Sequence, residues 1–284
     1  MTTAQQLTPR EFKLVTGFIY ERTGIYIPEE KLALVSNRLR KRLRALKLPG
    51  FMAYYDLMTK GGSEFEEEFP HFLSAVTTNE TYFFRNVKLW EMVSGELLDD
   101  LLELKAKQKS IAVWSAACSS GAEAYSVAIC LNEQRHKLRD WKLRIVGTDI
   151  SSRVLDIARE GIYNEYAVSK CAPERIRTNF KQLDADRYQL RADVRSMAEF
   201  KFHNLRDSMK EKFDFVLLRN VMMYFDTPMK IKVVRSVAAS MNPGGILYAG
   251  DVDPIRSTLD LNEFPQIEYV KPFIYRRTDA PSTH

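Results

Sequence analysis

Apolar residues follow two different spacings along the chain. Up to about residue 110 they recur every three or four positions, which is typical of amphipathic helices, and no strong strand pattern occurs there. From Ser110 onwards, short apolar runs alternate with helical patterns. Strands that alternate with helices indicate βαβ units and a parallel sheet. The sequence therefore predicts an all-α part followed by an α/β part.

The first part has clear helix ends. Thr8-Pro9-Arg10-Glu11 fits a capping box with proline at the first helical position, and Gly24 fits the end of that helix. A second helix is predicted from Pro28 to about Leu46, with an apolar stripe along one side. A third is predicted at 51–60. Ser63 and Glu66 fit a second capping box, which starts a fourth helix.

In the second part, strands are predicted at 111–116, 143–149, 200–205, 213–220 and 245–251, and helices between them at 122–135, 151–160 and 227–241. NFKQL and RYQLR flank the polar turn DAD and predict a small β-hairpin in an insertion at about 173–199. We place the domain boundary near 88–95, inside or beside a long helix. This gives a helical N-terminal domain at 1–90 and an α/β domain at 91–284.

Composition and charge narrow the class of protein. Apolar residues make up 45% and charged residues 28%, as in soluble globular proteins. We expect a cytoplasmic monomer without membrane insertion, because no apolar run reaches a membrane span and no signal-peptide core is present. Scattered cysteines and histidines argue against disulfides and a structural zinc site, and no metal is expected. The net charge is +5, and Lys and Arg crowd 36–47, which points to an acidic partner.

The stretch WSAACSSGAEAYS (114–126) lies where a strand turns into a helix, and ligands of open α/β sheets bind at such ends. A pyrophosphate needs several glycines there, but this turn has only Gly121. S-adenosylmethionine carries no phosphate and tolerates small side chains in that loop. MNPGGILYAG (241–250), a helix end, a Pro-Gly-Gly turn and a strand, is common before the fifth strand of methyltransferases. With no GxxxxGK[ST] motif, the pattern favours a methyltransferase over a kinase or dehydrogenase.

Asp149 closes the second predicted strand, about thirty residues after the first turn. A carboxylate at that place accepts both ribose hydroxyls in dinucleotide folds. The alternative is that Asp149 caps the following helix, although Ser151 is also available for capping. We favour ribose binding.

The end of the fourth strand indicates the methyl acceptor. LLRNVMMYFD (217–226) has neither the Asn/Asp-Pro-Pro-aromatic turn of base amino methylation nor a Pro-Cys nucleophile, and it contains no histidine. An acceptor that is already anionic at neutral pH needs no general base. A glutamate carboxylate, with a reference pKa of about 4.3, fits this requirement.

Three stretches, TTNETYFFRN (77–86), WSAACSSGAEAYS and RNVMMYFD (219–226), resemble the signatures of chemotaxis receptor methyltransferases of the CheR type. NRLRKRLRAL (37–46) resembles part of that family's N-terminal domain. The resemblance implies a class I, Rossmann-like methyltransferase domain with a small inserted β-hairpin, preceded by an all-α domain. It implies methyl transfer from S-adenosylmethionine to glutamate side chains on chemoreceptor helices, with S-adenosylhomocysteine as the product.

The resemblance also implies site residues. The cofactor contacts would be Asn79, Thr81, Arg85, Glu123, Asp149, Asn204, Leu205, Arg219 and Asn220. Arg85 and Tyr224 would lie closest to the reacting methyl group. A guanidinium forks onto a carboxylate, and a tyrosine orients it and faces the sulfonium.

Two departures from the family pattern affect this interpretation. GAEAYS replaces the usual Gly-Glu-Glu-Pro-Tyr-Ser, so Ala122 and Ala124 stand where Glu and Pro are typical, which could loosen the start of that helix; Glu123 is kept. Family members that dock on a receptor's C-terminal pentapeptide have a Gly-x-Gly turn in the inserted hairpin. Here the turn is LDADR (183–187), so no tether binding is expected.

The basic helix is interpreted as the receptor-docking surface. Arg38, Lys41 and Arg44 lie three apart, and no acidic residue occurs between Asn37 and Lys47. Glutamate-rich methylation helices would supply the opposite charge. A non-catalytic module that senses S-adenosylmethionine is the alternative function. A nucleic-acid methyltransferase would explain the basic helix, but the acceptor motifs and interleaved aromatic residues are missing, so no nucleic-acid partner is expected.

Overall fold

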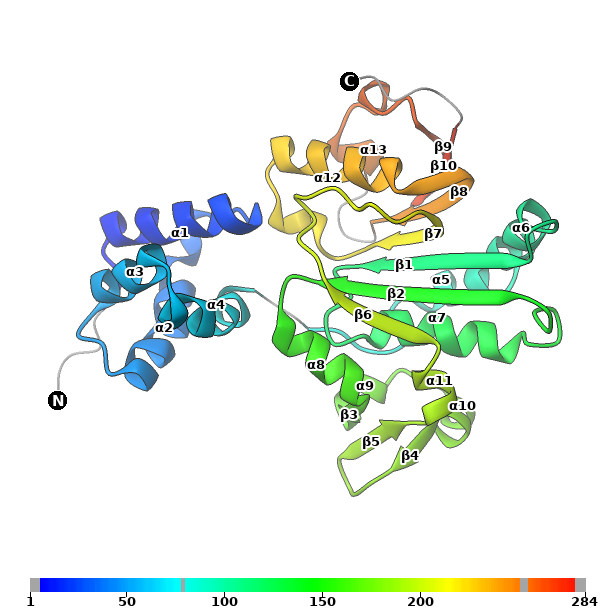
Figure 1. The fold of residues 1–284 in the computed structure, drawn as a ribbon, viewed down its shortest axis with the longest axis horizontal. Helices are drawn as coiled ribbons and strands as arrows, with labels where there is room; N and C mark the ends of the chain where they lie inside the picture. The colour runs from blue at the N-terminus through cyan, green and yellow to red at the C-terminus, as the bar shows by residue number, and fades with distance from the viewer. Residues whose placement is uncertain (1–5, 78–79, 251–254, 279–284) are drawn as a thin grey trace.

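The computed structural model describes residues 6–77, 80–250 and 255–278. Figure 1 shows a group of helices near the N-terminus set to one side of a sheet and its surrounding helices. The predicted order, an all-α part followed by an α/β part, is confirmed.

The helical part consists of α1 (Pro9–Thr23), η1 (Glu29–Lys31), α2 (Leu32–Leu46), α3 (Phe51–Lys60) and α4 (Ser63–Val76). The capping box of α1 is confirmed, because the Thr8 hydroxyl accepts from the Glu11 N–H while the Glu11 carboxylate accepts from the Thr8 N–H. Gly24 ends α1 with φ 76°, in the left-handed region that favours glycine. The apolar faces of these helices meet in one core around Ile19, Leu39 and Phe72.

The second predicted capping box, Ser63 with Glu66, is wrong. Gly62, with φ 86°, occupies the N-cap position of α4, and no side chain caps that end. Glycine turns the chain one residue earlier than expected, so Ser63 is already the first helical residue.

The α/β part is built on a sheet of β1 (Ser110–Ala116), β2 (Lys142–Asp149), β6 (Ala198–Phe202), β7 (Phe213–Leu218), β8 (Met241–Ala249), β9 (Ile267–Lys271) and β10 (Ile274–Arg277). The order is β6-β2-β1-β7-β8-β10-β9. The first five strands pair in parallel, and β10 runs antiparallel to both neighbours. Its helices are α5 (Val87–Ser94), α6 (Glu96–Leu104), α7 (Ala122–Glu133), α8 (Ser152–Glu160), α12 (Thr227–Ala239) and α13 (Ile255–Thr258), with short turns η2 (Met222–Tyr224) and η3 (Leu261–Glu263).

The two faces of the sheet carry separate cores. Val113 packs in a core with residues of α5, α6 and α7, whereas its neighbour Trp114 packs in a core with residues of α12. Successive side chains of a strand point to opposite faces, so near-continuous apolar runs are needed where both faces are covered. All six residues of β7 are buried for this reason.

Three local features differ from the sequence-based predictions. The expected Pro-Gly-Gly turn lies inside β8, where Met241 and Ile246 pair with Phe213 and Phe215 and the residues between them bulge out. The expected long helix is broken at Gly95 into α5 and α6. The hairpin of β9 and β10 was not predicted.

Residues on either side of 77–82 belong to different hydrophobic cores, and the domain boundary near 88–95 stays a prediction. Phe83, Phe84 and Leu89 are buried in the core of the α/β part, while Val76 belongs to the helical core. Phe83 packs against Tyr163 and Phe180 of the insertion, and Phe84 packs against Trp90 of α5.

The insertion is a three-stranded antiparallel sheet. It contains β3 (Ile162–Asn164), β4 (Phe180–Gln182) and β5 (Arg187–Leu190), with the short helices α9 (Glu165–Val168), α10 (Pro173–Asn179) and α11 (Ala192–Arg195). β4 and β5 form the expected hairpin, but β3 pairs with β5 as well, so the small sheet starts before residue 173. Asp184 closes the hairpin turn by accepting from the N–H groups of Asp186 and Arg187. Independence from a receptor tether stays a prediction.

Candidate functional site

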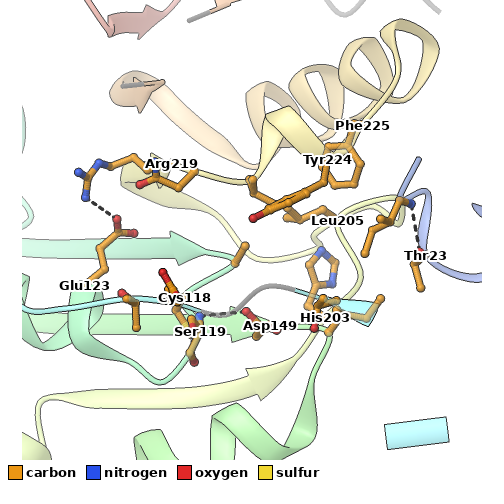
Figure 2. Close-up of a pocket in the computed structure, with 18 of the residues that line it drawn as sticks. Thr23, Cys118, Ser119, Glu123, Asp149, His203, Leu205, Arg219, Tyr224 and Phe225 are labelled. Carbon is orange, nitrogen blue, oxygen red and sulfur yellow. Dashed lines mark hydrogen bonds and ion pairs between the residues drawn. The ribbon is translucent and has the colours of Figure 1, made fainter. Parts of the chain in front are cut away.

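A pocket lies at the carboxyl ends of the parallel strands, facing the helical part. Its empty space is about 1030 Å³, part of it open to solvent. Figure 2 shows side chains from several strand ends around this space, with Thr23 of the helical part on one side. Its lining includes nine predicted site residues: Thr81, Arg85, Glu123, Asp149, Asn204, Leu205, Arg219, Asn220 and Tyr224. The tenth, Asn79, lies outside the described residues.

The turn after β1 is tight and already internally bonded. Ala117, Ser119 and Gly121 all have positive φ, at 60°, 51° and 85°, which costs backbone energy at the two non-glycine positions. The N–H groups of Cys118, Ser119 and Gly121 donate to Thr148, Asp149 and Cys118, respectively. These donors are therefore used inside the protein, so the turn is poorly suited to cradling a phosphate.

Asp149 is almost fully buried at the end of β2, with 7% of its surface exposed. Its two carboxylate oxygens accept from the N–H groups of Ser119 and Ser151, each at 2.9 Å. Burial raises the pKa of the Asp149 carboxyl, and these backbone bonds oppose the rise. Each oxygen keeps further lone-pair capacity toward the pocket. Ser151 is the N-cap residue of α8, and its side chain makes no capping hydrogen bond. Asp149 lies two residues earlier and does not occupy the N-cap position.

Glu123 and Arg219 form a buried ion pair in the pocket wall, 2.8 Å between Oε2 and Nη1 (Figure 2). The Arg219 side chain is 2% exposed. Glu123 also accepts from the Ser115 hydroxyl at 2.7 Å, and Arg219 donates to the Arg85 carbonyl at 2.9 Å. Arg219 is thus held between the first turn of α7 and the segment that carries Arg85.

Arg85 has a fixed backbone and a half-buried side chain in the pocket lining. The Trp90 indole N–H donates to its carbonyl at 2.9 Å, and the preceding Phe84 N–H donates to the Ser126 hydroxyl. The guanidinium carbon lies 5.6 Å from the centroid of the Tyr82 ring. Across residues 6–77, 80–250 and 255–278, no carboxylate forms an ion pair with Arg85. Its charge is therefore available for a ligand.

Two buried polar atoms of the lining lack a hydrogen-bond partner among the described residues. They are Nδ2 of Asn220, whose φ is 53°, and Nε2 of His203. Burial lowers the pKa of His203, which favours the neutral imidazole. Leaving a buried polar atom unpaired costs about 1–3 kcal/mol. Both residues line the pocket, so a polar ligand that reached these atoms would supply the missing hydrogen bonds.

Asn204 lines the pocket, but its amide is used within the protein. Its Nδ2 donates to the Arg22 carbonyl at 2.8 Å, and its Oδ1 accepts from the Arg206 N–H at 3.2 Å. Any ligand contact from this residue would use remaining capacity. Leu205, by contrast, presents a buried apolar side chain.

The sequence-based site missed the wall that comes from the helical part. Thr23, Ile25, Val76 and Thr77 line the pocket together with the strand ends. No local pattern marks these residues, because their role depends on how the two parts dock. His203 was recognised at a strand end but was not assigned to the site.

The predicted basic docking residues do not form one free strip. Lys41 and Arg44 are exposed on α2. Arg38 is half-buried and donates to the carbonyls of Val76 and Thr77, at the end of α4. Arg38 is therefore also a structural contact between two helices, which the charge pattern of α2 alone does not reveal.

Among the described residues, no group of three or more His, Cys, Asp or Glu side chains is arranged to hold a metal ion. Within the same ranges, no helix has the length and apolar character needed to cross a bilayer.

Comparison with known families decides the assignment. The family described as "CheR methyltransferase, SAM binding domain" matches residues 79–270, and "CheR methyltransferase, all-alpha domain" matches residues 10–77. The chain belongs to the CheR methyltransferase family. It is 31% identical over 278 residues to a chemotaxis protein methyltransferase of Borreliella burgdorferi, with 95% of each chain covered. It is 33% identical to chemotaxis protein methyltransferase 1 of Vibrio cholerae (91% of this chain, 94% of the other) and 31% identical to the Pseudomonas aeruginosa protein of the same name (94% and 97%).

Membership of the CheR family identifies the protein as an S-adenosylmethionine-dependent methyltransferase and its fold as the predicted class I domain behind an all-α domain. The pocket fits this cofactor, because it offers unpaired polar atoms, a buried carboxylate at a strand end and no free phosphate cradle. Ala122 and Ala124, which depart from the family pattern, are fully buried in α7, and Gly121 supplies the N-cap of that helix. The helix therefore starts where expected despite the two replacements.

Asp149→Ala is expected to weaken S-adenosylmethionine binding about 10- to 100-fold, because hydrogen bonds to a charged group contribute roughly 1.5–3 kcal/mol. Isothermal titration calorimetry measures the change. Since burial raises the pKa of Asp149, affinity of the wild-type protein should start to fall on acidification at a higher pH than an exposed aspartate would give. Asp156→Ala, at an exposed position of α8, is the control. Equal affinity of Asp149→Ala and wild type would remove Asp149 from the ribose site.

Proposed function

We propose that this protein transfers methyl groups from S-adenosylmethionine to glutamate side chains of chemoreceptors and forms γ-methyl esters, acting as a cytoplasmic monomer. The names of its relatives support a role in chemotaxis. The observation that carries the choice of acceptor is Arg85, a half-buried guanidinium in the pocket lining without a carboxylate partner among the described residues. A carboxylate substrate is the natural partner of such a group.

The chemistry requires no proton transfer. S-adenosylmethionine supplies a methyl group on a positively charged sulfur, and its transfer to a carboxylate oxygen breaks one S–C bond, forms one O–C bond and leaves S-adenosylhomocysteine. The protein then has to orient an anion and exclude water. Arg85 is assigned to hold the glutamate carboxylate, and Tyr224 to orient it. The Glu123–Arg219 pair and Asp149 are assigned to the cofactor.

The proposed function is tested with radiolabelled S-adenosylmethionine and a panel of receptor cytoplasmic fragments. Label that alkali releases as methanol identifies a carboxyl ester. Fragments in which the acceptor glutamates are changed to alanine serve as the control and should remain unlabelled. Alkali-stable label on protein or nucleic acid would refute the proposal, and so would binding of the cofactor without any transfer to a receptor.

The exposed basic residues of α2 are assigned to docking of the acidic methylation helices. Lys41→Glu combined with Arg44→Glu is expected to raise the KM for receptor at least about 10-fold at low salt, with cofactor affinity unchanged, because attraction becomes repulsion. The wild-type rate should fall with added salt, since exposed charges are screened beyond about 8–10 Å at physiological ionic strength. Arg38 is left unchanged here because it contacts α4.

The matched control is Arg135→Glu combined with Arg139→Glu. Both residues are exposed and follow α7 at its far end from the pocket, and the double change shifts the net charge by the same amount. If both double variants raise KM equally, the effect comes from net charge and the docking surface does not lie on α2.

A further inference from the structure

A short segment of the helical part, residues 20–26, contacts two of the loops that form the pocket. The Tyr26 N–H donates to the Tyr224 carbonyl at 2.8 Å, and the Arg22 carbonyl accepts from Asn204 at 2.8 Å. Gly24 lies against the Met229 side chain so closely that a Cβ atom would be 2.7 Å from Cε. The end of α1 is therefore packed directly onto the connection between β7 and α12.

Within this junction, Tyr20 makes a side-chain bond that joins the two parts. Its hydroxyl donates to Oδ2 of Asp226 at 2.9 Å. The other oxygen of Asp226 accepts from the Met229 N–H at 3.0 Å and so caps α12. The bond to Asp226 raises the pKa of the Tyr20 hydroxyl, in keeping with its role as the donor.

Tyr224 is itself one point of attachment, through its carbonyl, and Asp226 is another. Tyr224 ends η2, a three-residue turn, and a turn of this length is weakly stabilised by its own hydrogen bonds. The helical part fixes the turn at the Tyr224 carbonyl and again two residues later at Asp226. Tyr224 lines the pocket, whereas Tyr20, the residue of α1 that bonds to Asp226, does not.

We infer that Tyr20 is a positioning residue for methyl transfer: through Asp226 it holds the Tyr224 turn in the orientation that the reaction needs. This inference rests on the proposed function only for the acceptor and for the role of Tyr224. It assigns the all-α domain a part in the chemical step, in addition to binding the receptor.

The first test is the kinetics of Tyr20→Phe, which removes one hydroxyl and keeps the ring. We expect kcat to fall about 10-fold, equivalent to about 1.4 kcal/mol in the barrier, with the KM for receptor and the cofactor Kd unchanged. In a Tyr224→Phe background the same substitution should have little further effect, because two residues that act as one unit are not additive. Tyr26→Phe is the matched control, since Tyr26 uses only its backbone N–H at the junction.

Three results would overturn the inference: an unchanged kcat, a fall of equal size in the Tyr224→Phe background, or a fall explained by weaker cofactor binding alone. If the wild-type protein methylates receptors and Tyr20→Phe does so at the same rate, the inference is rejected and the proposed function is unaffected.

The second test does not depend on activity. Amide hydrogen exchange of a peptide covering residues 221–226 should be faster in Tyr20→Phe than in wild type or Tyr26→Phe, with and without S-adenosylhomocysteine. Equal exchange in all three proteins rejects the role of Tyr20, even if no receptor fragment accepts methyl groups.

Discussion

Arg85→Ala is expected to lower receptor methylation about 100- to 1000-fold, the loss typical when one preorganised charge-stabilising donor is removed from an active site. The cause is that Arg85 is the guanidinium of the pocket lining without a carboxylate partner among the described residues, whereas Arg219 is neutralised by Glu123. Single-turnover labelling of a receptor fragment measures the rate, and calorimetry measures S-adenosylmethionine affinity.

Arg85→Lys separates charge from geometry. Lysine keeps the positive charge but cannot fork onto both carboxylate oxygens, so we expect an intermediate rate. If calorimetry instead shows that Arg85→Ala loses cofactor affinity in proportion to rate, the guanidinium holds the cofactor's own carboxylate. A rate near that of wild type would move the reacting centre away from Arg85.

The second large effect is on stability. Arg219→Met is expected to lower the free energy of unfolding by about 3–5 kcal/mol, because it leaves the Glu123 carboxylate, which is only 13% exposed, without its charged partner. Urea denaturation followed by circular dichroism measures the loss. Adding Glu123→Gln should recover part of it, since the uncompensated charge is then removed.

Arg235→Met is the control for this experiment. It breaks a second arginine–glutamate pair, Arg235 with Glu263, whose side chains are 56% and 41% exposed. Exposed pairs contribute about 0–1 kcal/mol. Similar losses for Arg219→Met and Arg235→Met would mean that the buried pair has no special part in stabilising the site.

Much of the fold could be predicted because its signals are local. The capping box at Thr8 and Glu11 uses residues three apart, and it forms as expected. The buried run of β7 is apolar on both faces, so it is recognisable from sequence alone. The turn around Gly121 was predicted not to bind a phosphate because it has only one glycine. Its N–H groups bond within the protein, which agrees with this prediction.

The errors have two causes, a competing residue next to the motif and contacts with distant segments. Ser63 and Glu66 have the right spacing for a capping box, but Gly62 turns the chain first. Arg38 belongs to a run without acidic neighbours, yet it contacts the end of α4, which lies more than thirty residues away in the chain. Phe83 and Phe84 precede the α/β pattern, but they pack under the sheet.

In the candidate site, too, some residues were predictable from sequence and others were not. Its members at the strand ends were predictable, because the carboxyl edge of a parallel sheet gathers them. Thr23 and Ile25 were not, because they reach the pocket only through the docking of α1 beside Tyr224 and Asp226.

The pocket has walls from both the helical part and the sheet. Ligand binding is therefore thermodynamically linked to the docking of the two parts. A ligand that touches both walls binds the docked arrangement in preference to the undocked one, so part of its binding free energy becomes docking free energy. The linkage is reciprocal: if the receptor docks on α2 as proposed and holds it in the docked position, it increases affinity for the cofactor. Exchanging the helical part for that of a relative would therefore change cofactor affinity, even with every residue of the sheet retained.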